Sequence, residues 1–342
     1  MENDFAIIIG INDYTPPDKY GLRTLKGPIN DVDEMEKWLR DTTYGNIPDS
    51  NIKRVTSTPD PLQPLQNVID EKFLEIEDTI LTHKGGKARR LYFYFAGHGL
   101  GTLDNIVDTG LCLADWSERR RHSAISSESY KDYIRQYGYF EEIIFIADCC
   151  RNTKINIKPL HPTFSAPSPK SGAGNTRMFI AYATQYQDQA YEVEMGDSEN
   201  SEKRGAFTSV LIDGLKGAAA NNGIIDSNSL SGYLMNETPK LAQQWGYKQK
   251  PEIIVSNFDG IPILNIENLI NESETIITFS TERTGLIIIM DGNLRVIQEH
   301  DALVKNLTLK LPKGLYLLKD NNTGEEMPFQ VSPLQKNVYV SF

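Results

Sequence analysis

The sequence predicts an α/β domain with a mostly parallel sheet flanked by helices, followed by a small all-β sandwich domain. Continuously apolar runs at 91–96 and 143–147 are typical of strands buried on both faces of a parallel sheet. Segments with helical spacing separate such runs, and this alternation implies right-handed crossovers with helices on both faces. Beyond 273 the helical period is lost, and short runs of alternating polarity predict strands instead.

The first domain is expected to span residues 1–265. A buried strand at 5–11 leads into a Pro-containing loop, and a helix begins at Pro28 or Asn30, where acidic residues suit the helix dipole. The further strands are expected at 52–55, 91–96, 110–114, 143–148 and 178–184, and the further helices at 65–81, 126–137, 205–215 and 229–243.

Two connections in this domain are long. The segment 151–177 is rich in Pro, Ser and Gly and divides the domain into two halves, and a loop of that length is usually functional. The segment 185–204 is acidic and is also expected to be a loop.

The second domain is expected at 273–342. Turn signals such as Asp291-Gly292 separate its short runs, and a small antiparallel sandwich is the arrangement that they favour. Its strands are expected at 275–280, 285–290, 294–298, 307–311, 315–319, 329–331 and 338–340. We expect this domain to regulate the first one or to bind a partner protein.

Composition excludes several classes of protein. The net charge of -11 argues against a nucleic-acid binder that neutralises phosphates. The chain has no run of 18 apolar residues, which argues against a membrane span, and its N-terminus does not resemble a signal peptide. Three cysteines, two of them adjacent, make a disulfide framework improbable and favour a reducing, cytoplasmic location.

Polar residues follow two of the predicted strands directly. Gly97-His98-Gly99 ends one, and Asp148-Cys149-Cys150-Arg151 ends the other. If these parallel strands are neighbours, a histidine and a cysteine meet at the edge of the sheet where such folds bind ligands, which is the minimum for a cysteine nucleophile. Alternation along the strand places Asp148 and Cys150 on one side and Cys149 on the other, so Cys150 is the candidate nucleophile.

Simpler interpretations of both residues remain. His98 could be a turn histidine, and a cysteine is more often a small buried residue than a nucleophile. A zinc site is the other chemical alternative, but the cysteine pair lacks the C-x₂-C spacing and no second histidine is well placed. Glycines on both sides of His98 favour a functional role, because they let the backbone approach a substrate and stabilise an oxyanion.

These two stretches, YFAGHG at 94–99 and IADCCR at 146–151, resemble the His and Cys motifs of caspase-like cysteine peptidases. The resemblance is greatest to the metacaspase and bacterial caspase-homologue branch, and the separation of 52 residues fits it. Asn152 stands where the caspase signature has glycine. Further similar stretches lie at 7–12, 25–31, 183–184, 189–192 and 205–208, so that the resemblance covers residues 4–260, approximately.

The resemblance implies a six-stranded caspase-like sheet and hydrolysis of peptide bonds in protein substrates. Cys150 would attack the carbonyl, and His98 would act as base or protonate the leaving amine. The N–H groups of Gly99 and Cys150 would form the oxyanion site. A nearby imidazolium would lower the pKa of Cys150, and no third orienting residue is evident.

The resemblance also implies a primary specificity. Asp31 and Asp148 match the two carboxylates that line the metacaspase pocket, and two carboxylates favour Arg or Lys at the cleaved position. Asp31 could equally be an ordinary helix-start carboxylate. A pocket selective for Asp would need arginines, for which Arg23 and Arg151 are available.

Two further features could regulate such an enzyme. The lysines and the arginine of the 151–177 segment would suit self-cleavage; they are Lys154, Lys158, Lys170 and Arg177. No cofactor is required, but the acidic loop could bind an activating Ca²⁺, as in some metacaspases, although carboxylates so loosely spaced are more often solvated. Its carboxylates are Asp188, Glu192, Glu194 and Asp197.

The favoured hypothesis is therefore a regulated endopeptidase that acts on proteins, with no nucleic-acid or membrane partner. By analogy, bacterial caspase homologues with extra domains often serve as effectors in defence or stress systems, and some are zymogens that await a partner. The alternatives are a silent caspase-like adaptor, which the intact His98 and Cys150 argue against, and another acyl-transfer chemistry on the same pair.

Overall fold

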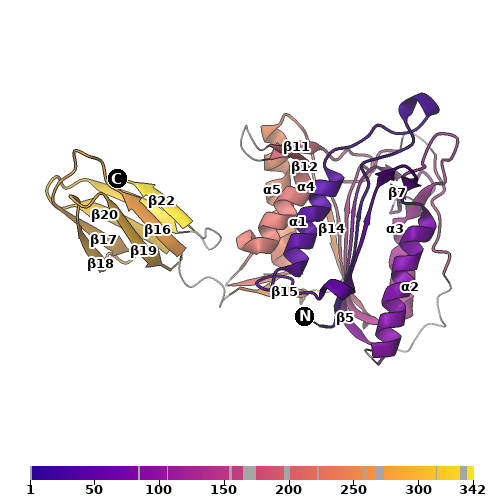
Figure 1. Ribbon diagram of the computed structural model, residues 1–342, viewed down its shortest axis with the longest axis horizontal. Coiled ribbons are helices and arrows are strands. Elements are labelled where there is room, and N and C mark those ends of the chain that lie inside the picture. The colour runs from indigo at the N-terminus through magenta and orange to yellow at the C-terminus, as the bar shows by residue number, and fades with distance from the viewer. Residues whose placement is uncertain are drawn as a thin grey trace. The chain divides into compact units, whose positions relative to one another are not determined.

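The computed structural model describes residues 2–83, 85–105, 107–153, 156–164, 175–195, 201–221, 223–256, 259–266, 273–312, 314–331 and 337–342. The chain divides into two compact units (Figure 1). The first comprises Met1–Ala219 with Ile225–Leu264, and the second comprises Ala220–Ile224 with Asn265–Phe342. No helix in the described part of the chain combines the length and the apolar composition that crossing a membrane requires.

A six-stranded sheet forms the centre of the first unit, in the order β14-β10-β9-β5-β1-β2 (Figure 1). Neighbouring strands run parallel, except for β10 and β14. The strands are β1 (Asp4–Gly10), β2 (Ile52–Thr56), β5 (Ala88–Ala96), β9 (Phe140–Asp148), β10 (Arg177–Tyr182) and β14 (Glu252–Val255). The predicted largely parallel, six-stranded sheet is therefore confirmed, although the analysis of the sequence did not identify the edge strand β14.

Helices cover both faces of this sheet (Figure 1). On one face lie α1 (Pro28–Arg40), α4 (Ala206–Asp213) and α5 (Ser227–Gln244); on the other lie α2 (Gln66–His83) and α3 (Ser127–Tyr137). Every predicted helix is present, and α1 begins at Pro28, the first of the two starts that the sequence offered.

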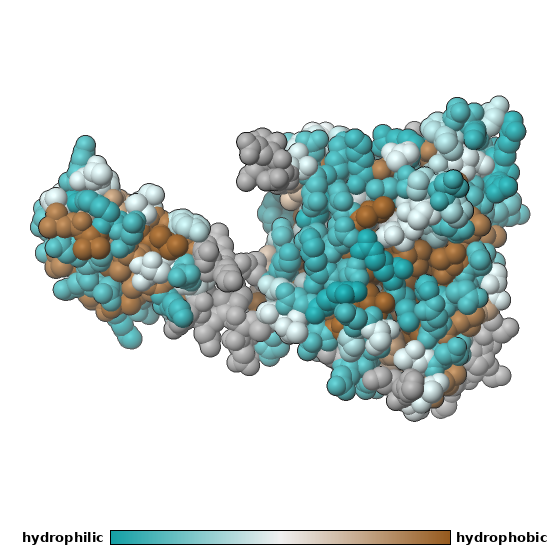
Figure 2. Space-filling view, viewed as in Figure 1, coloured by the Kyte–Doolittle hydropathy of each residue, from teal (hydrophilic) through white to brown (hydrophobic). Residues whose placement is uncertain are grey.

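The middle strands are apolar over 91–96 of β5 and 143–147 of β9, because helices enclose both of their faces. Phe93 on β5 and Phe145 on β9 are fully buried, and their rings stack at 4.6 Å between centroids. On the face of the molecule seen in Figure 2, hydrophilic side chains dominate the surface of the first unit. Apolar side chains therefore fill the middle of the sheet, between its helices.

The expectation of an acidic loop at 185–204 is wrong in part. The strands β11 (Glu192–Met195) and β12 (Glu202–Gly205) pair there as an antiparallel hairpin, with Glu192 opposite Gly205. Each strand has only four residues, and Glu and Lys are depleted in strands, so the sequence carries little strand signal. Residues 196–200 lie outside the described part of the chain.

Small strands extend the fold around the ends of the sheet. They form the antiparallel sheet of β6 (Gly99–Gly101), β7 (Thr109–Cys112) and β8 (Ala124–Ser126), the hairpin of β3 (Thr58–Pro59) and β4 (Leu62–Gln63), and the pair β13 (Ile224–Asp226) and β15 (Pro262–Asn265). A π-helical turn, Gly214–Ala218, follows α4.

All seven strands predicted for the second unit are present. They form a three-stranded sheet in the order β19-β16-β22 and a four-stranded sheet in the order β18-β17-β20-β21. Side chains of both sheets share one hydrophobic core, so the predicted sandwich is confirmed, although β16 and β22 pair in parallel. The strands are β16 (Ser273–Thr278), β17 (Leu286–Asp291), β18 (Val296–Asp301), β19 (Asn306–Leu311), β20 (Gly314–Asp320), β21 (Glu326–Val331) and β22 (Asn337–Ser341).

Candidate active site

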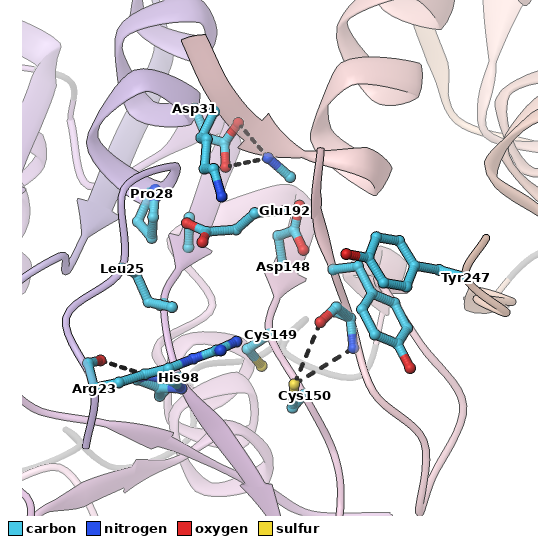
Figure 3. A pocket seen from close by; sticks show the side chains of 16 residues that line it. Arg23, Leu25, Pro28, Asp31, His98, Asp148, Cys149, Cys150, Glu192 and Tyr247 are labelled. Atoms are coloured by element: carbon cyan, nitrogen blue, oxygen red, sulfur yellow. Dashed lines mark hydrogen bonds between the residues drawn. The ribbon is translucent and has the colours of Figure 1, made fainter. Parts of the chain in front are cut away.

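The two candidate catalytic residues follow neighbouring strands. β5 and β9 pair in parallel with Ala96 opposite Asp148, so both strands end at the same edge of the sheet. His98 comes two residues after the end of β5, and Cys150 two residues after the end of β9. Both line a cavity of about 180 Å³, together with Asp31 and Asp148 (Figure 3). The predicted meeting of a histidine and a cysteine at this edge is present.

Close backbone packing joins the two strand ends. A Cβ atom on Gly99 would lie 2.5 Å from both the Cys149 sulfur and the Cys150 carbonyl oxygen, which is far too close. Only glycine therefore fits at position 99. Cys149 is 2 % exposed and belongs to the hydrophobic core, whereas Cys150 is partly exposed. The two cysteines thus occupy the different environments that alternation along the strand predicted.

The imidazole of His98 is oriented by a backbone group. Its Nε2 lies 2.9 Å from the Arg23 carbonyl oxygen, an acceptor, so Nε2 carries the proton. In the neutral ring Nδ1 is then the basic nitrogen. Burial lowers the pKa of His98 below its usual value, so the neutral form is favoured. Because the orienting group is a carbonyl in a loop, no side-chain pattern in the sequence indicates it.

The thiol of Cys150 forms hydrogen bonds with the backbone of a loop. It donates to the Ala190 carbonyl (3.5 Å) and accepts from the Ala190 N–H (3.4 Å). Burial raises the pKa of Cys150 above its usual value, and the charge of Asp148 adds to this effect. The expectation that a nearby imidazolium lowers this pKa is wrong for the structure, which favours a neutral thiol beside a neutral imidazole.

One of the two predicted oxyanion donors has no acceptor among the described residues. Within that part of the chain, the Cys150 N–H donates no hydrogen bond. Gly99 packs directly against the Cys150 backbone, as its tight contacts show. This geometry is compatible with a shared anion site for the two N–H groups, which remains a prediction.

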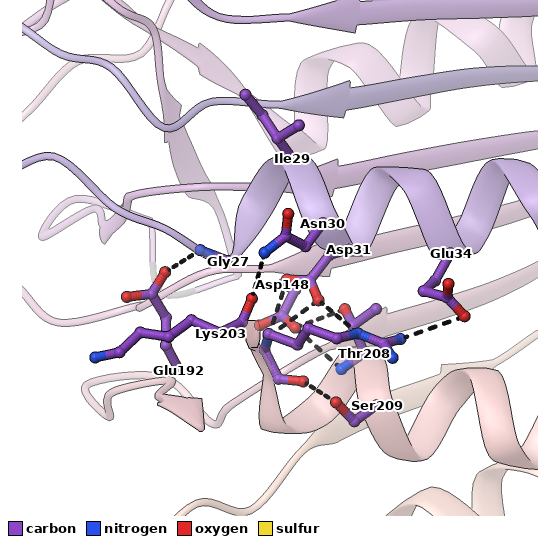
Figure 4. A network of polar contacts seen from close by, with 12 residues as sticks. Gly27, Ile29, Asn30, Asp31, Glu34, Asp148, Glu192, Lys203, Thr208 and Ser209 are labelled. Atoms are coloured by element: carbon purple, nitrogen blue, oxygen red, sulfur yellow. Dashed lines mark hydrogen bonds and ion pairs between the residues drawn. The ribbon is translucent and has the colours of Figure 1, made fainter. Parts of the chain in front are cut away.

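Asp31 and Asp148 meet at the N-terminus of α4 (Figure 4). The Gly205 N–H donates to both carboxylate oxygens of Asp31, at 3.0 and 2.9 Å. The N–H and the hydroxyl of Thr208 donate to one oxygen of Asp148, at 3.1 and 2.7 Å. A Cβ atom on Gly205 would lie 2.2 Å from a carboxylate oxygen of Asp148, so a larger residue there would displace that carboxylate. The helix terminus thus holds both carboxylates beside the cavity.

Both of these carboxyl groups are harder to ionise than usual. Burial raises the pKa of Asp31 well above its ordinary value, and the charge of Asp148 raises it further. Burial also raises the pKa of Asp148 to about 6, against the opposing effect of the Thr208 hydrogen bonds. Near neutral pH the pair therefore carries less than two full negative charges. A cation in the cavity would favour the doubly ionised form.

Glu192 is a third carboxylate of the cavity. The sequence did not predict that it belongs to this site. One of its oxygens accepts from the N–H groups of Lys26 (2.9 Å) and Gly27 (2.5 Å), immediately before α1. Helix N-termini stabilise negative charge, so this contact fixes the acidic side chain beside Asp31 and Asp148. The only signal in the sequence was the family resemblance at 189–192.

The two arginines considered for an Asp-selective pocket lie in different places. Arg23 lines the cavity. Arg151 is fully buried and donates to Thr109 (2.9 Å) and Glu252 (2.6 Å), so it does not reach the cavity. Arg204 lies behind Asp31, with 3.8 Å between its Nε and the carboxylate. The cavity lining therefore contains three carboxylates but few cationic side chains.

The predicted calcium ligands do not converge in the described part of the chain. Glu192 caps α1, while the carbonyl of Asp188 accepts from the Arg151 N–H at 3.0 Å. Among the residues that the structure describes, no group of three or more His, Cys, Asp or Glu side chains could hold a metal ion. Asp197 lies outside those residues.

The structure narrows the predicted self-cleavage sites. Arg177 is the first residue of β10, where it pairs in register with Glu142 and forms an ion pair with it, so its peptide bond is held in the central sheet. Arg177 is therefore a less accessible cleavage site than the residues before β10. Lys158 lies in the preceding connection, where its N–H donates to His122 at 3.3 Å. Lys154 and Lys170 lie outside the described residues.

Comparison with known proteins agrees with this geometry. The family model described as "Caspase domain" matches residues 3–259. A probable protease from a Desulfuromonadales bacterium is 28% identical over 224 residues. The aligned part is 64% of this chain but only 26% of that relative, so about three quarters of the relative has no counterpart in the alignment.

Replacing Asp148 by Asn should change how stability depends on pH. Because the pKa of Asp148 is raised to about 6 in the folded state, its stabilising contribution is complete below the unfolded pKa, near 3.8, and is lost as pH rises through 6. The amide oxygen introduced by D148N could still accept from Thr208 without titrating. We expect the free energy of unfolding of D148N, relative to the wild type, to rise by up to about 3 kcal/mol between pH 4 and pH 7.5. Urea unfolding at several pH values measures this, and parallel curves would contradict it.

Proposed function

Because the chain belongs to the caspase domain family, we propose that it is a cysteine endopeptidase in which Cys150 and His98 cleave peptide bonds of protein substrates. The observation that carries the proposal is the cavity at the ends of β5 and β9, where a thiol, an oriented imidazole and three carboxylates meet. The relative named as a probable protease supports the same reaction class.

The geometry supports a mechanism in which the histidine moves protons. The Cys150 sulfur attacks the substrate carbonyl and its proton passes to Nδ1 of His98, because Nε2 is held by the Arg23 carbonyl. The Gly99 and Cys150 N–H groups would bind the oxyanion. His98 then protonates the leaving amine, and water releases the acyl group from the sulfur.

The preferred residue at the cleaved position would be Arg or Lys. Asp31, Asp148 and Glu192 present a cluster of negative charge in a partly buried cavity, and only Arg23 and Lys203 oppose it among the described residues of the lining. A guanidinium can bond two carboxylates in a plane, so arginine should bind better than lysine. An acidic side chain would meet repulsion there.

The contacts of the unliganded Cys150 thiol indicate that the peptidase activity is regulated. The substrate carbonyl must reach a sulfur that now contacts both the N–H and the carbonyl of Ala190, so the 188–190 segment has to shift. We propose that the protein is a zymogen and that binding of a protein partner causes this shift. The C-terminal sandwich would be the domain that binds the partner. Free cysteines suit a reducing cytoplasm, and by analogy with bacterial caspase homologues that carry extra domains the role would be in defence or stress.

A catalytically silent adaptor is the second candidate. The observation that favours it is the neutral, backbone-bonded thiol of Cys150. Such a protein would act by binding alone, and substitution of Cys150 would leave its partners unaffected.

Cleavage of a fluorogenic peptide panel distinguishes these two functions. We expect hydrolysis after Arg and Lys but not after Asp, and we expect Cys150→Ala and His98→Ala each to lower kcat/KM at least about 100-fold, because nucleophile and base act as one unit. Assays with and without Ca²⁺ test metal activation. Preference for Asp would refute the pocket assignment, and full activity of C150A would refute the mechanism.

Neutral substitutions in the cavity should weaken binding of basic substrates. For Asp31→Asn and Glu192→Gln we expect kcat/KM for an Arg substrate to fall about 10-fold or more, chiefly through KM, because hydrogen bonds to charged groups contribute about 1.5–3 kcal/mol. Asp213→Asn at the far end of α4 is the matched control and should keep wild-type values. Equal effects at all three positions would argue against a charge-selective cavity.

Self-cleavage in the connection between the two halves can be seen directly on a denaturing gel. We expect the purified wild type to yield two fragments cut after a basic residue within 151–177 but before β10, and C150A to remain one band. Lys158→Gln tests the described site. A single wild-type band, identical to that of C150A in an active preparation, would contradict this prediction.

A further inference from the structure

Tyr14 contacts the candidate catalytic histidine in two ways, and the mechanism above does not use it. Its hydroxyl oxygen accepts from the backbone N–H of His98 at 2.8 Å. Its ring meets the imidazole edge to face, with 4.8 Å between centroids and 64° between planes. Tyr14 is 3 % exposed and does not line the cavity, so it cannot touch a substrate itself.

The segment that carries Tyr14 is held firmly on both sides. The N–H groups of Asn12 and Asp13 donate to the Ser57 hydroxyl at 2.9 and 3.1 Å, and that hydroxyl donates back to Asp13 at 3.0 Å. The Thr15 N–H donates to the Ala114 carbonyl at 2.8 Å. The backbone on both sides of Tyr14 is therefore held by bonds that do not involve His98.

The same loop supplies the second contact to the imidazole. The Asn12 carbonyl accepts from the Leu25 N–H at 2.9 Å, which closes the loop between Tyr14 and Arg23. Arg23 then offers its carbonyl to Nε2 of His98 at 2.9 Å. Tyr14, near one end of the loop, thus holds the backbone and the ring of His98. Arg23, near the other end, holds Nε2 of the same ring.

We infer that Tyr14 is a positioning residue for the peptidase reaction, which holds His98 so that Nε2 stays on the Arg23 carbonyl and Nδ1 faces the thiol and the leaving amine. This inference rests on the proposed function. The hydroxyl anchors the histidine backbone, and the aromatic edge restricts rotation of the imidazole. A histidine without these contacts could turn its basic nitrogen away from the reacting atoms, which costs rate without changing how the substrate is bound.

Two substitutions separate the contributions of the ring and the hydroxyl. For Tyr14→Phe, which keeps the ring, we expect kcat to fall about 10-fold; for Tyr14→Ala, which loses both contacts, we expect a fall of about 100-fold, the scale of a small misplacement of a catalytic group. KM for the Arg substrate should stay within about twofold in both. Wild-type kcat in both variants, or a change confined to KM, would overturn the inference.

Tyr130→Phe is the matched control for loss of a buried hydroxyl. Tyr130 is fully buried on α3 and donates to Asp70 at 2.5 Å, away from the cavity lining. We expect it to keep the wild-type kcat even if its urea midpoint falls. An equal loss of kcat in Y130F and Y14F would show that destabilisation alone explains both. If Y14A fails to fold, Y14F carries the comparison.

The tautomer of His98 can be observed without any catalysis. The chain has only five histidines, so ¹⁵N-labelled imidazoles can be assigned with a His98→Ala spectrum. In the C150A background we expect the Nε2–H form of His98, and we expect a mixture of tautomers once Y14A is added. An unchanged tautomer in that double variant would overturn the inference. Because this readout needs no turnover, it remains decisive even if the peptidase assignment itself fails.

Discussion

The parallel pairing of β5 with β9 is the constraint on which the site depends. Helices enclose both strands, which accounts for the apolar runs at 91–96 and 143–147. The register sets Ala96 opposite Asp148, and therefore brings the polar residues that end both runs to one place. The close approach of Gly99 to Cys150 follows from this register, and a larger residue at 99 would separate the two strand ends.

The rest of the cavity comes from segments that are distant in the chain but converge on helix termini. α1 contributes Asp31, and the N-terminus of α4 holds it beside Asp148 through Gly205 and Thr208. The β11–β12 hairpin in turn contributes Glu192, which accepts a hydrogen bond from the Gly27 N–H at the start of α1. Each carboxylate thus satisfies backbone N–H groups that would otherwise lack partners, so the acidic lining also fastens the two halves of the domain together.

The sequence predicted what depends on local pattern. Apolar runs located the strands of the sheet that carry the two candidate residues, and alternation distinguished Cys149 from Cys150. It did not predict contacts that side-chain identity does not encode: the Arg23 carbonyl on His98, the Ala190 backbone on the thiol, and the role of Glu192 in a hairpin with little strand propensity. A lowered pKa was expected for Cys150, but burial raises it. Burial follows from tertiary packing, which the local sequence pattern does not give.

Charge links the carboxylate cluster to the nucleophile. Burial is the main cause that raises the pKa of Cys150, and the charge of Asp148 adds to it, so the residue that would attract a basic side chain also opposes formation of the thiolate. In the proposed reaction, a guanidinium bound at Asp148 offsets that charge and removes this opposition at the moment when the scissile carbonyl arrives. Glu192 and Asp31 add attraction, while Arg204 limits the repulsion within the cluster before a substrate binds. The acidic cavity would then select the substrate and restrain the unliganded thiol through one electrostatic effect.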